Sequence, residues 1–102
     1  MRVLKSKPEL ERVIEARCLR HAKRLGWTSR KMNGLGFRAW PDRLFIPPNE
    51  IPDRVMFFVE FKRVGERPTP LQRAVHTNLR ARGQAVFIID SLEEFEDVLA
   101  RR

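Results

Sequence analysis

The sequence predicts an α/β fold with the element order α-β-β-β-α-β-α and a central mixed sheet flanked by helices. Three observations predict it. Residues 55–62 are rich in β-branched and aromatic side chains, which is typical of a strand buried on both faces. Two motifs, at residues 69–72 and 91–94, have the form of capping boxes that begin helices. A second apolar run, at residues 85–89, lies between these helices, so residues 55–89 are expected to pair two strands in parallel around a helix.

The first predicted helix begins at a capping box in which Ser6 is the N-cap and Glu9 reaches back to it. The helix continues to about residue 25 and ends at Gly26, since glycine is the residue type that most often follows a helix. Apolar side chains at helical spacing predict its buried side: Leu10, Ile14, Cys18 and Leu25, with Ala22 close to them.

Turn residues and apolar runs predict the remaining elements. Short strands are expected at residues 27–32 and 43–46, and a stretch rich in proline, residues 47–53, separates the second from the strand at 55–62. Thr69 caps a helix that has Pro70 at its first position and ends at Gly83. Residues 85–89 form the next strand, and Ser91 caps the last helix. No linker divides the chain, so we expect one domain over residues 1–102.

The charge of the chain indicates a polyanionic partner. Lys and Arg total 21 against 13 Asp and Glu, a formal net charge of +8, and the sequence pI is near 11.0. This favours nucleic acid as the partner, although a solubility surplus or an acidic protein partner gives the same charge. The single cysteine excludes a disulfide framework and a cysteine-rich zinc site. We expect a cytoplasmic protein, because no apolar run could span a membrane and no secretory signal is recognised.

Two charged residues end the apolar strand at residues 55–62. Glu60 and Lys62 are two positions apart, so in a strand they project from the same face. Charged side chains are rarely buried unless they are paired or bind a metal. An ordinary strand end, where the chain leaves the sheet, is the alternative explanation for this pair.

A third charged residue, Asp42, precedes the strand at residues 43–46. The turn-rich stretch between the two strands predicts a hairpin, and antiparallel pairing then brings Asp42 beside Glu60. Two carboxylates at one sheet end repel each other unless a cation joins them, and Mg²⁺ prefers such oxygen ligands. The alternative is that Asp42 is only a turn residue after Pro41.

Pro41-Asp42 followed by Glu60-Phe61-Lys62 resembles the signature of the PD-(D/E)xK phosphodiesterase superfamily. The helix start at residues 69–72, the acid in the first helix and the basic segment with glycines before Pro41 extend this likeness. Essentially the whole chain resembles a stand-alone VRR-NUC domain, a virus-type replication-repair nuclease. One departure is the extended stretch 35–40, since family members often place glycine close to the Pro-Asp pair.

The resemblance implies a restriction-endonuclease-like core and a role for each matching residue. Asp42, Glu60 and the carbonyl of Phe61 would bind Mg²⁺ or Mn²⁺, and Lys62 would be the catalytic lysine. The family also has a glutamate on the first helix, for which Glu11 is the best match. Glu11 also projects into the apolar stripe, where a lone carboxylate is costly unless it is paired or near a metal.

Several assignments stay open at this point. Glu15, one turn after Glu11, is the second candidate for the first-helix acid, and Glu11 itself is also explained as a first-turn acid favoured by the helix dipole. Gln72 completes a capping box, and in the family a glutamine here also approaches the active site. His76 is expected on a helix surface, because two isolated histidines, His21 and His76, do not make a zinc site.

Aromatic and basic residues around Asp42 also allow two interpretations. Trp27 and Trp40 are expected in the core, although Trp40 could stack on a base. The basic residues near the candidate site are expected to hold phosphates, unless they only solvate loops. These residues are Arg30, Lys31, Arg38, Arg43, Arg63 and Arg67.

The resemblance implies a metal-dependent, structure-specific DNA endonuclease that acts in repair or recombination. A Holliday (four-way) junction resolvase is the preferred expectation, because small relatives of this type act as homodimers and a junction has two-fold symmetry. The cell would be bacterial or a phage-infected host. Two alternatives remain open: a basic DNA-binding module without catalysis, and a nuclease subunit that requires a partner protein.

Overall fold

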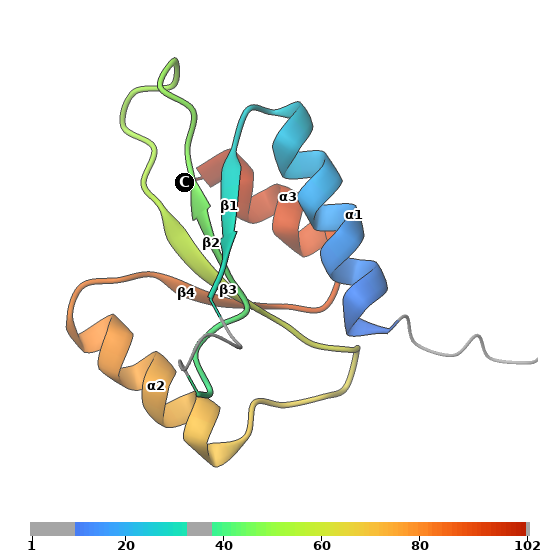
Figure 1. Cartoon of the computed structure of the whole chain (residues 1–102), viewed down its shortest axis with the longest axis vertical. Helices are drawn as coiled ribbons and strands as arrows, with labels where there is room; N and C mark the ends of the chain where they lie inside the picture. Colours follow the sequence, from blue (N-terminus) through green and yellow to red (C-terminus); the bar gives the residue numbers. More distant parts are fainter. Residues whose placement is uncertain (1–9, 33–37, 102) are drawn as a thin grey trace, which may run out of the picture.

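A computed structural model of the chain describes residues 10–32 and 38–101. In these residues the elements follow the predicted order α-β-β-β-α-β-α (Figure 1). They are α1 (Glu11–Arg24), β1 (Thr28–Lys31), β2 (Arg43–Ile46), β3 (Phe57–Phe61), α2 (Pro70–Ala81), β4 (Val86–Ile89) and α3 (Leu92–Arg101).

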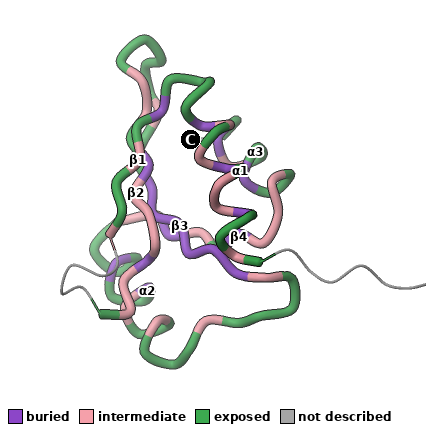
Figure 2. Tube along the Cα trace, turned by 45° about the vertical axis from the view of Figure 1, so that its right-hand side comes forward, coloured by how far each residue is buried: buried purple, intermediate pink, exposed green. Residues whose placement is uncertain are grey.

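The strands form one mixed sheet in the order β1-β2-β3-β4. The pairs β1–β2 and β2–β3 are antiparallel, and β3–β4 is parallel, as the helix between those two strands predicted. β3 therefore lies inside the sheet, and all five of its residues are buried. In Figure 2 a continuous buried stretch of the trace runs along this strand.

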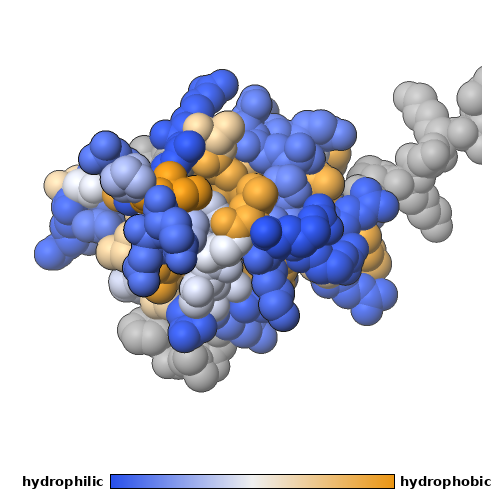
Figure 3. Space-filling view, turned by 90° about the horizontal axis from the view of Figure 1, so that it is seen from above, coloured by the Kyte–Doolittle hydropathy of each residue, from blue (hydrophilic) through white to orange (hydrophobic). Residues whose placement is uncertain are grey.

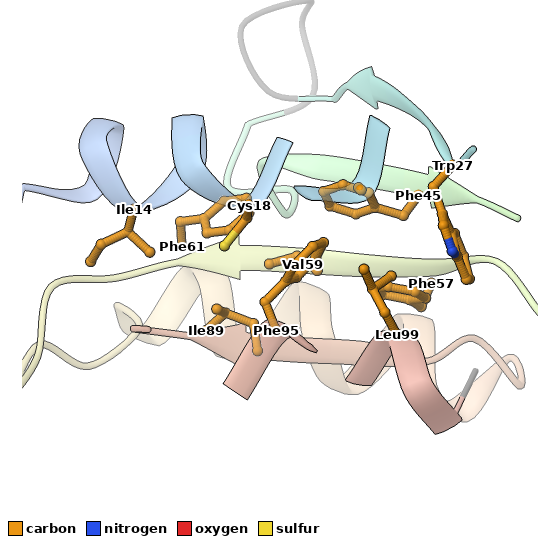
Figure 4. Close-up of a cluster of buried hydrophobic side chains, with 11 residues drawn as sticks. Ile14, Cys18, Trp27, Phe45, Phe57, Val59, Phe61, Ile89, Phe95 and Leu99 are labelled. Atoms are coloured by element: carbon orange, nitrogen blue, oxygen red, sulfur yellow. The ribbon is translucent and has the colours of Figure 1, made fainter. Parts of the chain in front are cut away.

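The two faces of the sheet are covered by different helices. α1 and α3 lie together against one face, and α2 lies on the other (Figure 1). The α1/α3 face holds the larger apolar cluster, in which Phe57, Val59 and Phe61 of β3 meet side chains from both helices (Figure 4). The α2 face holds a smaller cluster centred on Phe58, Leu79 and Val86. Successive β3 residues thus alternate between the two faces, as a strand requires.

The helix boundaries confirm one capping box and correct the start of the first helix. Thr69 Oγ1 accepts the Gln72 N–H at 3.1 Å, and Gln72 Oε1 accepts the Thr69 N–H at 2.8 Å, which completes the predicted box. α1 begins at Glu11, later than predicted, because Leu10 is extended and has no side-chain cap. The capping box expected at residues 6–9 lies outside the described residues.

The predicted buried stripe on α1 is wrong at its first and last residues. Leu10 is 42% exposed and Leu25 is 49% exposed, because one precedes the helix and the other follows it. Only Ile14, Cys18 and Ala22 are buried on this helix. Gly26 has φ +86°, a conformation that glycine adopts readily, and so ends the helix as expected.

The connection between β2 and β3 forms the end of the molecule that is uppermost in Figure 1. The strand predicted from residue 55 begins only at Phe57, and both Val55 and Met56 are exposed. Seen from above, this end is largely hydrophilic with hydrophobic patches between the polar groups (Figure 3). None of the described helices is long and apolar enough to cross a membrane.

Candidate active site

Asp42 and Glu60 meet at one end of the β2–β3 hairpin. Arg43 lies opposite Val59 in the antiparallel register, so one step further the register places Asp42 opposite Glu60. Two backbone contacts fix Asp42: its Oδ2 accepts the Phe61 N–H at 2.7 Å, and its carbonyl oxygen accepts the Met32 N–H at 2.9 Å. The hairpin predicted from the sequence therefore brings the two carboxylates together.

Glu60 is 2% exposed and points to the α2 face of the sheet, together with Lys62. Its Oε2 atom accepts a hydrogen bond from Gln72 Nε2 at 3.2 Å and lies 3.9 Å from Lys62 Nζ. Gln72 thus has both of the roles that the sequence left open, since its Oε1 caps α2 while its Nε2 contacts Glu60. The Lys62 N–H donates to the Ile89 carbonyl at 2.9 Å, which fixes the backbone of the lysine on β4.

Negative charge on Asp42 and Glu60 is disfavoured, as the raised pKa values of both carboxyl groups indicate. Burial raises the pKa of Glu60 to about 8, with a further rise from Asp42 and an opposing effect of Lys62. Burial also raises the pKa of Asp42, against the lowering effect of its hydrogen bond from Phe61. The interaction between the two carboxyl groups lowers the pKa of Asp42 and raises that of Glu60, which is the pattern of a pair that shares one proton. A proton or a cation between them is therefore favoured.

Glu11, at the first turn of α1, reaches the same end of the sheet. Its pKa is raised, first by burial and then by a hydrogen bond and repulsion from Glu66, while Lys62 lowers it and Asp42 raises it. These effects place Glu11 within the electrostatic reach of both Asp42 and Lys62. The first turn of the helix and the loop after β3 therefore contribute carboxylates that interact with each other, and Glu11 also interacts electrostatically with Asp42.

Glu15, the other candidate on α1, has a different partner. Its Oε2 accepts a hydrogen bond from Arg43 Nε at 2.6 Å, and the two side chains are 25% and 22% exposed. The negative charge of Glu15 raises the pKa of Asp42, so it is not remote from the site. Nevertheless, the ion pair already occupies Glu15 and neutralises Arg43, a residue expected to hold phosphate.

The other five basic residues named from the sequence surround the same end of the sheet. Arg30 and Lys31 are exposed on β1, whose end adjoins Asp42 through the Met32 hydrogen bond. Arg38 is exposed shortly before Asp42 in the chain, and Arg63 and Arg67 follow Lys62, the first partly exposed and the second exposed. Their positions leave positive charge at the surface around the buried carboxylates.

His76 corrects the sequence interpretation, which placed it on a helix surface. The residue is 1% exposed, because α2 turns it towards the sheet one turn after Gln72. Its Nε2 atom lies 3.5 Å from Glu60 Oε1, and neither atom has a hydrogen-bond partner among the residues that the structure describes. Burial lowers the pKa of His76, and Arg80 and Lys62 lower it further. The sequence contained a signal for this position, since residues four apart share one helix face.

Both tryptophans that were expected in the core make ring contacts with phenylalanines of β3. Trp27 is 6% exposed and meets Phe57 edge to face, with ring centroids 5.4 Å apart. Trp40 is partly buried and meets Phe58 in the same way at 6.0 Å. Ala39, just before Trp40, has φ 63°, a left-handed conformation that favours glycine. An alanine in this conformation, directly before the Trp40-Pro41-Asp42 segment, is strained.

The donor atoms at this site fit a divalent cation. Within residues 10–32 and 38–101, no three His, Cys, Asp or Glu side chains are grouped as a metal cluster, and the hairpin brings together the two carboxylates of Asp42 and Glu60. The N–H and C=O of a strand residue point to the same side, so the Phe61 carbonyl is directed towards Asp42, as its N–H is. Two carboxylates and a carbonyl are oxygen ligands of the kind that Mg²⁺ and Mn²⁺ prefer.

A mixed sheet that brings a carboxylate pair and a lysine together at one end defines a restriction-endonuclease-like α/β domain. No family model matches the sequence. The chain is, however, 37% identical over 78 residues to "Putative nuclease p44" of Acyrthosiphon pisum secondary endosymbiont phage 1, and the match covers 76% of this chain and 80% of that protein. A solved VRR_NUC domain matches with a TM-score of 0.74 and 28% identity, over 88% of this chain and 94% of the other. The chain belongs to the VRR-NUC family of nuclease domains.

Proposed function

We propose that this protein is a metal-dependent DNA endonuclease with Asp42, Glu60 and Lys62 as its catalytic centre. The observation that carries the proposal is the buried pair of carboxyl groups beside a lysine that is only 8% exposed. Burying such charges without a function is costly. Membership of the VRR-NUC family supports phosphodiester hydrolysis, and the net charge of +8 supports DNA as the substrate.

In this proposal Asp42, Glu60 and the carbonyl oxygen of Phe61 hold Mg²⁺ or Mn²⁺, and Glu11, which interacts electrostatically with Asp42, is the further acid. When bound, a divalent cation supplies positive charge to the scissile phosphate and lowers the pKa of the attacking water. The raised pKa of Glu60, about 8, and that of Asp42 support this assignment, because the pair binds a proton at neutral pH when no cation is present.

The chain's own residues would prepare the phosphate for attack. Lys62 would hold its ammonium beside the phosphate oxygens on which charge builds, and it could also orient the attacking water. The hydrogen bond from Gln72 would keep Glu60 directed towards the site. The surface bases Arg30, Lys31, Arg38, Arg63 and Arg67 would bind flanking phosphates and set the position of the DNA.

For the substrate we propose branched DNA, with a four-way junction as the first choice and a homodimer as the active form. A two-fold symmetric dimer presents two sites to a junction that itself has two-fold symmetry. This step rests on likeness to small VRR-NUC proteins, and a fold alone does not fix a substrate. A role in DNA repair or recombination, in the cytoplasm of a bacterial or phage-infected cell, follows from that choice.

The test is cleavage of an end-labelled four-way junction and of a duplex of matched length and sequence. Wild type, Asp42→Asn and the control Asp97→Asn are each assayed with Mg²⁺, Mn²⁺ or EDTA. The asparagine at residue 42 keeps an oxygen for the Phe61 N–H but removes the charge. Asp97 is an exposed α3 residue paired with Arg101, so its variant should cleave normally.

Metal-dependent cutting that is lost only in Asp42→Asn would support the nuclease, and a strong preference for the junction would support the resolvase. Equal cutting of both substrates would remove the structure-specific part of the proposal. Tight binding without cutting in any metal would instead favour a DNA-binding module, or a subunit that needs a partner protein. Adding a candidate partner and regaining cleavage would distinguish the second of these.

A further inference from the structure

The two carboxylate oxygens of Glu60 face different residues of α2. Oε2 receives the Gln72 amide at 3.2 Å and is the oxygen nearer to the Lys62 ammonium, at 3.9 Å. Oε1 is buried and faces His76 Nε2 at 3.5 Å, and within residues 10–32 and 38–101 neither of these two atoms has a hydrogen-bond partner. One oxygen therefore belongs to the catalytic end of the sheet, while the other is turned into the protein.

The position of His76 is set by the helix and not by the carboxylate. Residues 72 and 76 are one turn apart, so Gln72 and His76 leave α2 from the same face. The Thr69 cap fixes the start of the helix, and Leu79 packs on Phe58 and Val86 near its end. Arg80 Nη2 also donates to the Val86 carbonyl at 2.6 Å, which ties the helix to β4. His76 is thus held beside Glu60 by a helix that is fixed at both of its ends.

A histidine that only filled space here would be a poor choice. A buried polar nitrogen without a partner costs about 1–3 kcal/mol, whereas an apolar side chain of similar shape costs nothing of this kind. The unpaired acceptor Oε1 of Glu60 carries a similar cost. Because the two atoms already face each other at 3.5 Å, a small rotation of either side chain would satisfy both.

We propose that His76 is a positioning residue that donates its Nε2–H to Glu60 Oε1, so that Glu60 offers only Oε2 to the catalytic cation. The inference rests on the proposed metal-dependent function and deepens it. It assigns Glu60 as a monodentate ligand, with His76 and Gln72 each holding one of its oxygens. Partners of metal-binding carboxylates commonly fix their orientation in this way.

The first test measures Mn²⁺ affinity by isothermal titration calorimetry, without DNA and without catalysis. His76→Phe keeps a ring of similar size but has no N–H, whereas His76→Gln keeps an N–H that can reach the same oxygen. His21→Phe makes the same chemical change at the other histidine, on α1, which contacts Arg24 and not the site. Urea unfolding of each metal-free variant measures stability separately.

We expect His76→Phe to bind Mn²⁺ about 10- to 100-fold more weakly, while His76→Gln stays within about threefold of wild type. His21→Phe should bind normally. If His76 is only a packing residue, the phenylalanine variant will differ from wild type in unfolding alone and will bind Mn²⁺ equally well, which overturns the inference. If wild type itself binds no Mn²⁺, the proposed metal-dependent function is refuted, and the role of His76 at the cation is refuted with it.

A second measurement uses the wild-type protein and does not depend on the folding of any variant. Long-range ¹H–¹⁵N spectra of histidine-labelled protein, saturated with diamagnetic Mg²⁺, report which ring nitrogen of His76 carries the proton. The inference requires a proton on Nε2. A neutral ring protonated on Nδ1 alone would place two acceptors face to face, and that result would refute the hydrogen bond.

Discussion

The two faces of β3 differ although they belong to the same five residues. The face towards α1 and α3 carries Phe57, Val59 and Phe61, which are all almost fully buried in one apolar cluster. The face towards α2 carries Phe58, which is apolar, and then Glu60, which is charged, and Lys62 follows beyond the end of the strand.

This difference teaches how a small domain can hold a costly site. Buried carboxylates oppose folding, since desolvation disfavours their charged form. On this strand the apolar face supplies the burial that stabilises the sheet, and the other face carries the charged groups only where the strand ends. Changes on the first face should therefore act on stability, and changes on the second face on chemistry.

Loss of the Lys62 charge is expected to have the largest effect. We expect Lys62→Met to reduce single-turnover cleavage of DNA by about 10²- to 10³-fold or more, because the ammonium no longer stabilises charge on the phosphate. Stability should change little, since the Asp42–Glu60 pair already binds a proton at neutral pH and does not need this ammonium to neutralise its charge. Urea unfolding of the same preparation checks this, and full activity of Lys62→Met would contradict the assignment of the catalytic lysine.

Truncation on the apolar face should show the opposite result. Phe95 of α3 is fully buried, with ring centroids 4.9 Å from Phe45 and 6.4 Å from Phe61. We expect Phe95→Ala to lower the free energy of unfolding by about 3–5 kcal/mol, while cleavage per folded molecule stays near wild type. Leu71→Ala, at a half-exposed position of α2, is the control and should cost about 0.5 kcal/mol or less. Equal losses in the two variants would show that the apolar cluster is not the main source of stability.

Variants of the two acids of α1 should also differ, one in metal binding and cleavage and the other in stability. Glu11→Gln is expected to weaken Mn²⁺ binding and cleavage by about tenfold, because Glu11 interacts electrostatically with Asp42 and Lys62. Glu15→Gln should instead lower stability by about 1 kcal/mol through loss of the partly buried ion pair with Arg43. Calorimetry and urea unfolding of both variants test this. The reverse pattern would make Glu15 the first-helix acid.

A smaller effect is expected at Ala39, the strained residue before the Pro-Asp pair. Replacing it by glycine removes a conformational cost of about 1 kcal/mol but increases the entropy of the unfolded chain. We expect Ala39→Gly to raise the free energy of unfolding by about 0.5 kcal/mol. Asp53→Gly, at φ 67°, is the comparison and should gain less, because Asp tolerates this conformation better. A clear loss of stability in Ala39→Gly would show that the alanine side chain contributes packing.

The smallest effect concerns acid pairing at the start of α3, away from both faces of β3. A hydrogen bond with Asp90, followed by burial and repulsion, raises the pKa of Glu94 from 4.5 to about 7. The folded protein thus holds a proton that the unfolded chain releases. This contribution to stability is fully present below about pH 4.5 and is lost as the pH rises through about 7.

Glu94→Gln should remove this pH dependence while keeping the backbone contact of residue 94 with Ser91 Oγ. Because Glu94 is exposed, we expect a difference of about 0.5 kcal/mol or less between pH 5 and pH 8. Thermal unfolding at both pH values, compared with Glu93→Gln as the neighbouring control, would detect it. A steeper pH dependence in Glu94→Gln than in wild type would contradict the direction of the pKa shift.

The sequence was sufficient for the element order and for the central pair of carboxylates. Period-two alternation placed Glu60 and Lys62 on one face, and hairpin pairing placed Asp42 beside them. The same alternation could have assigned Arg43, since it shares a face with Phe45 and so points to α1, where Glu15 meets it. The sequence interpretation of Arg43 did not consider that parity, and its role on phosphate stays a prediction.

Other features depended on three-dimensional packing. Val55 and Met56 belong to the same apolar run as β3. They are nevertheless exposed, because they precede Phe57, the first residue of the strand. His76 lies four residues after Gln72, but only the docking of α2 on the sheet turns that helix face into the interior. Glu11 and Glu15 are also one turn apart, and their separate partners come from a loop and a strand far along the chain. Local sequence patterns do not contain such partners.

The joint cover of one sheet face by α1 and α3 bears on what happens while the chain is being synthesised. Asp42, Glu60 and Lys62 leave the ribosome before Phe95 and Leu99, which complete the cluster that Ile14 and Cys18 begin. A nascent chain that already displays the proposed catalytic residues therefore still lacks the packing that holds them in place, since a domain folds as a unit. Nuclease activity would accordingly begin only after α3 has emerged, which would protect nucleic acid near the ribosome from an incompletely folded enzyme.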